Sequence, residues 1–164
     1  MNTAPLHTRR SSHGMTLAEM AISMAVVTIV TVGLFNVFVQ VLRSYNTTTL
    51  MRTAAVRASS GLERMVFGVG TNTSLREAPA SSVSVTYSNS VDWTFSYTNN
   101  LCFKYTSAKN SITDQSGKLI CTNVVSPTTI SNLTNGCLIT ISVCESGGGR
   151  TVTNTMTTFV QYRN

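Results

Sequence analysis

The chain has 164 residues, which fits one domain of ordinary size plus a terminal segment. Lys and Arg number 12 against 6 Asp and Glu, a net charge of +6, and both histidines, His7 and His13, lie in the first 14 residues. The rest of the chain therefore cannot hold a Ser-His-Asp or Cys-His site or a His metal ligand. We expect a protein that is not an enzyme, with no catalytic residues, no metal and no cofactor.

The first 14 residues, MNTAPLHTRRSSHG, form a polar and basic leader that ends at Gly14, directly before a strongly apolar run. A secretory signal carries its small-residue cleavage site after its apolar core. Because Gly14 precedes the core, cleavage after Gly14 removes only the leader and leaves the apolar run on the mature chain. Without Arg9 and Arg10, 10 basic residues face 6 acidic residues, a balance of +4.

Residues 20–42 are long enough to cross a membrane. These 23 residues rise about 35 Å as an α-helix, and a bilayer core is about 30 Å thick. Arg9 and Arg10 closely precede the span. The positive-inside rule therefore places the leader in the cytoplasm and the rest of the chain across the membrane.

Glu19 stands at the edge of this apolar span, where a carboxylate is costly and indicates a function. The N-terminus of a helix compensates part of that cost through its dipole. A cut before Met15 would create an α-amino group four residues from Glu19. In a helical filament, Glu19 of one subunit could then meet the Met15 amine of a neighbour. The alternative is that Glu19 marks the start of an ordinary signal anchor.

Gly14, the sequence Met15-Thr16-Leu17-Ala18-Glu19 and the apolar run together resemble the prepilin signal of type IV pilins and type II secretion pseudopilins, over residues 9–42. The resemblance implies that a prepilin peptidase cuts between Gly14 and Met15 and methylates the new amino group of Met15. It also implies that Glu19 is the acidic residue needed for assembly. The first mature residue is Met rather than the commoner Phe. The span holds Asn36 and no helix-kinking Pro, which favours a minor subunit.

The resemblance implies a structural subunit, a minor pseudopilin or minor pilin, of a type II secretion pseudopilus or a type IV pilus. The implied partners are other pilins or pseudopilins, prepilin peptidase, the inner-membrane assembly platform and membrane lipid. The chain would lie in the bacterial inner membrane with its C-terminal domain in the periplasm, and later in a periplasmic or cell-surface filament. The alternative is a membrane-anchored adhesin or DNA-uptake subunit. No nucleic-acid-binding motif accompanies the charge, and we do not expect nucleic acid as a partner.

The helical pattern continues beyond the span. Apolar residues at spacings of three and four predict an amphipathic helix to about residue 67, loosened near residues 46–49 and ended by Gly68 and Gly70. The arginines on this helix are expected to form a solvated face or one near anionic lipid: Arg43, Arg52, Arg57 and Arg64. Residues 61–66 and 75–78 are also similar to minor pseudopilins of the J type and to pilin-W-like proteins.

Six alternating runs rich in β-branched and aromatic residues predict an antiparallel sheet packed on the helix. They are residues 82–87, 91–97, 101–106, 118–125, 137–144 and 151–162, with turns expected at 99–100, 114–117, 135–136 and 147–149. The expected fold is α+β and pilin-like. Its parts are the leader 1–14, the transmembrane and assembly helix 15–43, and the periplasmic domain 44–164.

Four cysteines, Cys102, Cys121, Cys137 and Cys144, lie in the C-terminal domain. In an oxidising compartment we expect disulfides. Cys137 and Cys144 cannot pair if one strand joins them, because seven extended steps separate them by roughly 23 Å. This leaves Cys102 or Cys121 paired with the later two, or Cys102 with Cys121. A four-cysteine zinc site is the rival, without a supporting C-x-x-C spacing.

The remaining carboxylates are expected to be solvated residues at or near turns: Glu77, Asp92, Asp114 and Glu145. Asp92-Trp93 and the tyrosines Tyr87, Tyr97 and Tyr105 could form a ligand face. Sheet packing explains these aromatic residues equally well.

Overall fold

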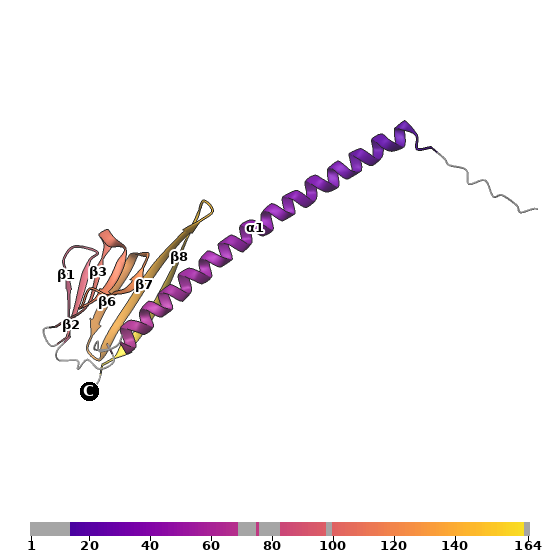
Figure 1. Cartoon of the computed structure of the whole chain (residues 1–164). Helices are drawn as coiled ribbons and strands as arrows, with labels where there is room; N and C mark the ends of the chain where they lie inside the picture. Colours follow the sequence, from indigo (N-terminus) through magenta and orange to yellow (C-terminus); the bar gives the residue numbers. More distant parts are fainter. Residues whose placement is uncertain (1–13, 69–74, 76–82, 98–99, 163–164) are drawn as a thin grey trace, which may run out of the picture. The chain divides into compact units, whose positions relative to one another are not determined.

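The computed structural model describes residues 14–68, 75, 83–97 and 100–162. It contains one long helix, α1 (Leu17–Phe67), followed by eight antiparallel strands in these described ranges (Figure 1). The predicted α+β layout is confirmed. Contacts within the chain divide it into two compact units, Met1–Arg43 and Ser44–Asn164.

Helix α1 runs for 51 residues, and the loosening predicted near residues 46–49 is absent from it. The hydroxyls of Thr48 and Thr49 donate to the carbonyls of Ser44 and Tyr45, at 2.9 and 3.0 Å. Polar side chains that bond back to the preceding turn in this way are compatible with a continuous helix. The helix ends where predicted, because Gly68 adopts a φ of 80°, the left-handed conformation that glycine provides after a helix.

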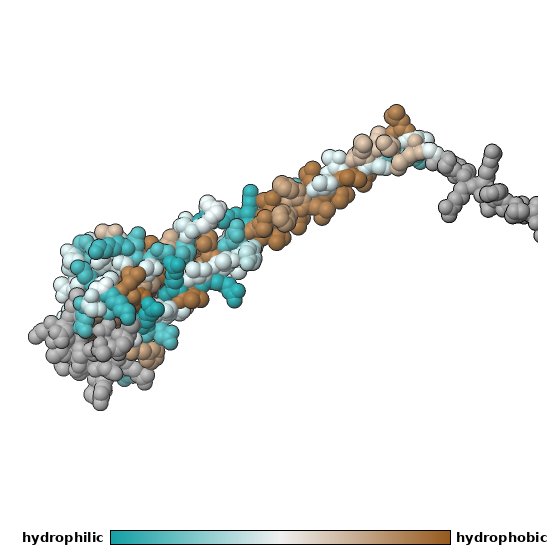
Figure 2. All heavy atoms as spheres, in the orientation of Figure 1, coloured by the Kyte–Doolittle hydropathy of each residue, from teal (hydrophilic) through white to brown (hydrophobic). Residues whose placement is uncertain are grey.

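The part of α1 in the first unit is apolar on all sides. An 18-residue window reaches a mean hydropathy of 2.3 with none of its residues buried, so the helix is a candidate membrane span by length and composition. Its apolar side chains appear as a brown run in Figure 2. Thr28 and Thr31 donate to the carbonyls of Met24 and Val27 at 2.7 Å, so these hydroxyls find partners inside the helix, as a lipid environment requires.

The second unit holds two sheets rather than the single predicted sheet. The five-stranded sheet has the order β1-β2-β3-β4-β5 and the three-stranded sheet the order β6-β7-β8. Asn123, with a φ of 57°, separates β5 from β6 and breaks the predicted strand 118–125. The strands are β1 (Val83–Tyr87), β2 (Trp93–Tyr97), β3 (Asn100–Thr106), β4 (Ser111–Asp114), β5 (Leu119–Thr122), β6 (Val124–Leu133), β7 (Gly136–Gly147) and β8 (Arg150–Gln161), with a short 3-10 helix at Ser107–Lys109.

Strands β7 and β8 form a long hairpin. Their register is unbroken from Gly136 opposite Gln161 to Gly147 opposite Arg150. Gly148 and Gly149 form the two-residue turn, with φ values of 58° and 73° that a side chain would disfavour. The predicted glycine tip is confirmed.

Of the other predicted turns, the one at 114–117 is confirmed by the Gly117 N–H, which donates to the Asp114 carbonyl at 3.0 Å. The turn predicted at 135–136 lies one residue earlier, because Gly136 already pairs with Leu133. Of the turn predicted at 99–100, residue 99 lies outside the described residues, and Asn100 already belongs to β3. In the loops predicted at 99–100 and 135–136, the second residue therefore belongs to the following strand.

The core of the second unit lies between α1 and the sheets. Ala54, Ala58 and Met65, which share one side of the predicted amphipathic helix, are fully buried, whereas Met51 is 50% exposed. Gly61 is also buried and comes so close to β5 that a Cβ there would lie 3.1 Å from the Cβ and Sγ of Cys121.

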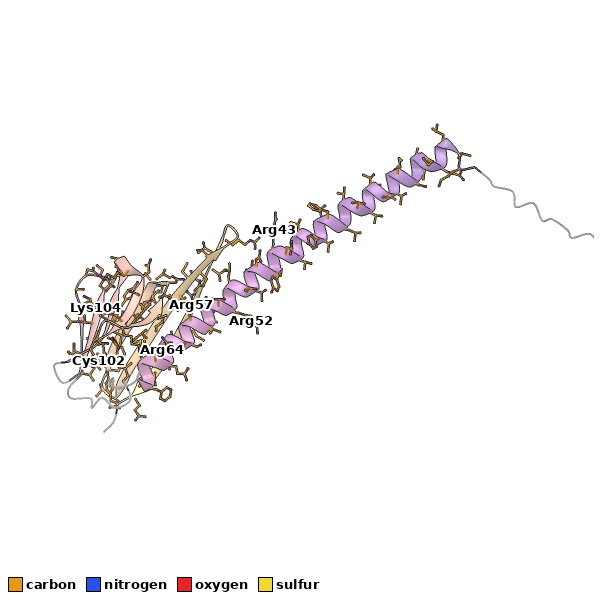
Figure 3. All side chains as sticks on the ribbon, in the orientation of Figure 1. Arg43, Arg52, Arg57, Arg64, Cys102 and Lys104 are labelled. Atoms are coloured by element: carbon orange, nitrogen blue, oxygen red, sulfur yellow. The ribbon has the colours of Figure 1, made fainter. Side chains whose placement is uncertain are left out.

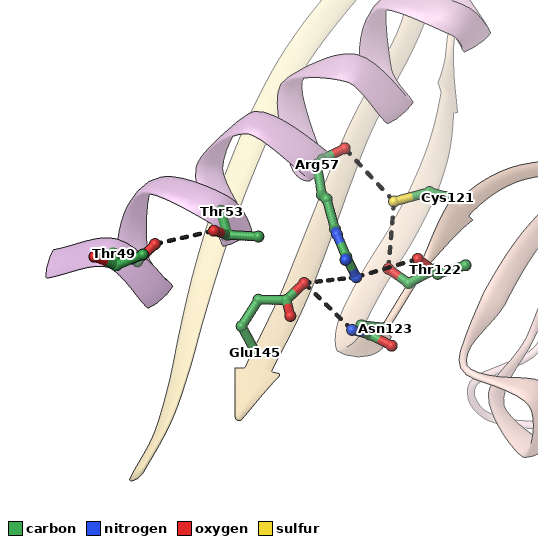
Figure 4. A network of polar contacts seen from close by, with 7 residues as sticks. All are labelled: Thr49, Thr53, Arg57, Cys121, Thr122, Asn123 and Glu145. Atoms are coloured by element: carbon green, nitrogen blue, oxygen red, sulfur yellow. Dashed lines mark hydrogen bonds and ion pairs between the residues drawn. The ribbon is translucent and has the colours of Figure 1, made fainter. Parts of the chain in front are cut away.

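Two arginines of α1 bond to the sheets instead of forming only a solvated face, which corrects the prediction (Figure 3). Arg57 Nη1 lies 2.8 Å from Oε1 of Glu145 on β7, which also accepts a hydrogen bond from Asn123 at 3.2 Å (Figure 4). Arg64 Nη1 donates to the Ile120 carbonyl of β5 at 3.3 Å. These contacts fix α1 against both sheets.

Candidate functional site

The residues singled out by the sequence motif surround the start of α1. Gly14, Met15 and Thr16 precede the helix, and Glu19 lies in its first turn. Met15 is 63% exposed and Leu17 is 89% exposed. The peptide bond between Gly14 and Met15 therefore lies in an exposed segment outside regular structure, which is where a protease can reach the main chain.

Thr16 and Glu19 form a reciprocal cap on the helix. The Glu19 carboxylate oxygen Oε2 accepts the Thr16 main-chain N–H at 2.9 Å and the Thr16 hydroxyl at 3.0 Å. The Glu19 N–H donates to the Thr16 Oγ1 at 3.3 Å. This is the capping-box arrangement, in which residues three apart satisfy each other's free N–H groups. The pattern Thr-x-x-Glu from Thr16 to Glu19 is the sequence signal for this cap.

Nothing in the described structure requires glycine at position 14. A Cβ built there meets no atom within 4 Å, and its φ is not in the left-handed region. A glycine that the fold does not need is consistent with recognition by another protein. The described residues therefore give no packing reason for glycine at position 14.

The structure places the four cysteines on three strands, each as a thiol. Cys137 and Cys144 share β7, and β4 separates Cys102 on β3 from Cys121 on β5. Strands two positions apart lie about 9.6 Å from each other, beyond the distance that a disulfide spans. Pairing of Cys102 or Cys121 with the two β7 cysteines stays a prediction.

Burial controls the chemistry of two of these thiols. Burial raises the pKa of Cys137 to about 11, and the hydrogen bond with Tyr162 opposes this effect. Burial also raises the pKa of Cys121, partly offset by the charge of Arg57. Both are therefore poor nucleophiles near neutral pH. Among the described residues, no three His, Cys, Asp or Glu side chains are grouped so that they could hold a metal ion.

Three carboxylates that were predicted to be solvated accept hydrogen bonds or form an ion pair within the fold. Asp92 accepts the Ser107 N–H at 2.7 Å. Asp114 is 3% exposed and accepts the N–H groups of Ser116 and Lys118 within its turn, so it is not the solvated residue that was predicted. Glu145 is also buried and pairs with Arg57, which corrects its prediction in the same way. Glu77 lies outside the described residues.

The aromatic residues support packing rather than a ligand face. Trp93 and Tyr105 are buried, with ring centroids 6.0 Å apart, and the Trp93 indole donates to the Thr128 carbonyl at 3.0 Å. The Tyr87 hydroxyl donates to the Ile130 carbonyl at 2.9 Å. The side chain of Tyr97 lies outside the described part of the structure.

Residues 9–35 match a family model described as the prokaryotic N-terminal methylation motif. No curated protein and no solved structure matches the chain. The match covers residues 9–14 of the predicted leader, the Gly14–Met15 bond and the apolar segment as far as Phe35. It supports the resemblance to type IV pilin-like proteins, a structural class, and to substrates of prepilin peptidase.

Proposed function

We propose that this chain is a structural subunit, a minor pseudopilin or minor pilin, of a type II secretion pseudopilus or a type IV pilus. Prepilin peptidase cuts it between Gly14 and Met15 and methylates the Met15 amine. The leader lies in the cytoplasm and residues 44–164 lie in the periplasm, because Arg9 and Arg10 directly precede the span. The observation that carries the proposal is an unburied apolar helix with Glu19 in its first turn, inside a match to a methylation motif.

The cap on Glu19 explains how an acidic residue is tolerated before assembly. Thr16 supplies two hydrogen bonds to one carboxylate oxygen. An ionised carboxylate has about four acceptor positions, so it can accept further donors. When the helix enters an apolar bundle of other such helices, water no longer solvates the charge, and a cationic partner becomes necessary.

The amine created at Met15 is the proposed cation. It lies four residues before Glu19 in the mature chain, and a methylated amine keeps its positive charge, as methylated lysine does. In a filament, the Met15 amine of one subunit pairs with Glu19 of its neighbour. Assembly in this account depends on the charge of Glu19, whereas cleavage depends on the junction at Gly14.

Substitution of Glu19 tests the assembly role. The Glu19→Ala chain should be cut by the peptidase as the parent chain is, but should be missing from the sheared filament fraction, because the unpaired amine stays uncompensated. Glu63→Ala, which removes an exposed carboxylate of the same helix, should be recovered like the parent. Recovery of Glu19→Ala in filaments at the parent level would contradict the proposal.

A further inference from the structure

The two sheets have four edge strands among the described residues: β1, β5, β6 and β8. An edge strand presents unpaired main-chain N–H and C=O groups, which are a template for pairing with another chain. Proteins protect such edges with short strands, bulges, proline, charge or a covering element. Three of the four edges in this protein have such protection.

Strands β1 and β6 face each other through side chains. The Tyr87 hydroxyl of β1 donates to the Ile130 carbonyl of β6 at 2.9 Å and accepts the Ile130 N–H at 3.4 Å. The Asn132 amide of β6 donates to the Val83 carbonyl of β1 at 3.3 Å. Main-chain groups on both edges are thus already bonded, and β1 is only five residues long.

Strand β6 is further interrupted, and β5 is covered. The register of β6 shifts between Val125 and Thr129, a stretch that includes Pro127. Strand β5 has four residues and lies against α1, where Arg64 donates to the Ile120 carbonyl. Neither edge offers a long regular row of free main-chain groups.

Apart from Arg150 at its start, whose Nη1 donates to Thr47 Oγ1 of α1 at 2.9 Å, strand β8 has none of these protections among the described residues. It pairs with β7 over twelve residues without a register shift. Its sequence, RTVTNTMTTFVQ, contains no proline and no acidic residue or lysine, and Arg150 at its start is its single charge. A long, regular and uncharged edge of this kind is a pairing site for another strand.

The hairpin register shows which groups face outward. Gly147 and Arg150 close a two-residue turn, so they form a hydrogen-bonded pair, and such pairs then alternate along the ladder. The Tyr162 N–H donates to the Asn135 carbonyl at 3.0 Å, so even-numbered residues bond toward β7 at the far end also. The main-chain groups that point away from β7 belong to Thr151, Thr153, Thr155, Thr157 and Phe159, which are all exposed.

The two faces of β8 define the chemistry of a partner strand. On one face, threonines of β8 pair with hydroxyls of β7, with Oγ–Oγ distances of 3.1, 2.8 and 3.1 Å for Thr151, Thr155 and Thr157. On the other face, Val152 and Met156 are half-buried. A fourth strand would extend the first face with hydroxyls and cover the second with apolar side chains.

We propose that β8 is a docking strand that accepts, through main-chain hydrogen bonds, an extended and uncharged segment of another protein subunit, with alternating hydroxyl and apolar side chains. The partner strand completes a four-stranded sheet with β6, β7 and β8. This inference goes beyond a role in a filament and does not depend on membrane insertion or on cleavage of the leader.

A peptide with the sequence of residues 150–161 has the required alternation and serves as the probe. Fluorescence polarisation of the labelled peptide should show saturable binding to the full chain in detergent micelles. The same peptide N-methylated at the positions of Thr153, Asn154, Thr157 and Thr158 cannot hydrogen-bond normally through either edge. It should bind at least about tenfold more weakly, because two N–H groups are lost at either edge and each lost hydrogen bond is worth about 1 kcal/mol.

Two variants of the full chain test the same edge by changing β8 itself instead of the peptide. Thr155→Pro removes one outward N–H and should weaken peptide binding about fivefold, because one lost hydrogen bond is worth about 1 kcal/mol. Thr155→Val keeps the N–H and the β-branched shape and should bind the peptide more tightly than Thr155→Pro does. Fluorescence of the buried Trp93 checks that both variants fold. If Thr155→Pro fails to fold, the comparison between the two peptides still tests the proposal. Absence of saturable binding, or equal binding of the methylated peptide, would overturn the proposal.

Discussion

Arg57 of α1 and Glu145 of β7 form an ion pair whose two members are unequally buried. The side chain of Glu145 is 11% exposed and that of Arg57 is 42% exposed. Removal of the arginine leaves a carboxylate that water barely reaches, whereas removal of the charge on Glu145 leaves a cation that water can solvate. Arg57→Ala should therefore lower the free energy of unfolding by about 2 kcal/mol, and Glu145→Gln by less than about 1 kcal/mol.

Urea unfolding of the full chain in detergent, followed by Trp93 fluorescence, measures both values. Arg52→Ala, on the same helix and without a contact to β7 among those described, is the control for helix propensity and should change the stability by less than about 0.5 kcal/mol. Equal decreases in the free energy of unfolding for Arg57→Ala and Glu145→Gln would show that unequal burial does not determine how much stability each substitution removes.

Close packing of Gly61 against Cys121 predicts the effect of a larger side chain. Glycine inside a helix normally costs about 1 kcal/mol relative to alanine, but a Cβ here would lie 3.1 Å from the Cβ and Sγ of Cys121. Gly61→Val should destabilise the protein by about 2 kcal/mol through overpacking. Removal of the sulfur with Cys121→Ala in the same chain should recover part of the loss in urea unfolding. A Gly61→Val chain as stable as the parent would contradict this packing.

The buried thiols predict an order of alkylation. At pH 8, iodoacetamide should modify Cys144 first, because it is half-buried, and Cys137 last, because its pKa is raised to about 11. Peptide mapping of the reduced, folded chain measures the order. Rapid modification of Cys137 at pH 8 would contradict the burial.

The same raised pKa predicts a loss of stability in alkali. A thiol with a pKa near 9 in the unfolded chain and about 11 in the folded chain favours folding below pH 9, and this contribution is lost as the pH rises through 11. Substitution by alanine should remove this part of the pH dependence. Urea midpoints of the parent chain and Cys137→Ala between pH 8 and 11 make the comparison. Parallel profiles would count against the raised pKa.

The lowered pKa of Asp92 predicts that the stability of the fold depends on pH in the acidic range. Hydrogen bonds from the Ser107 hydroxyl and N–H lower the pKa of Asp92 below its usual value of 3.8. A lowered carboxyl pKa stabilises the fold above the unfolded value, and this contribution disappears as the pH falls through the folded value. Asp92→Asn should therefore be less stable than the parent at pH 7, and the difference should shrink below about pH 4. Thermal unfolding at both pH values tests this.

Local patterns accounted for the elements with strong periodicity. The stripe of Ala54, Ala58 and Met65 and the stop at Gly68 were readable because helix periodicity and glycine chemistry act over a few residues. The split into two sheets was not readable, because it depends on the left-handed conformation of Asn123. Strands β4 and β6 were missed since the first is short and the second contains Pro127, which argues against a regular strand.

Some of the residues discussed as candidate functional residues were also readable from the sequence, whereas the contacts of others were not. The junction at Gly14 and the acid at Glu19 were visible because a charge pattern and an apolar run define them in the chain itself. Recognition of the pair between Arg57 and Glu145 required the tertiary fold, since the two residues are far apart in sequence. Burial of Asp114 likewise depends on how its turn packs, which a turn signature does not reveal.

The N-terminus of the chain in cells that contain a prepilin peptidase tests the central claim most directly. Intact-mass spectrometry should find a chain that lacks residues 1–14 and carries one methyl group on the amine of Met15. Gly14→Val, whose Cβ would meet no atom within 4 Å, should fold normally and keep the full precursor mass. A parent chain that retains its leader in these cells, or that begins at a residue other than Met15, would contradict the account.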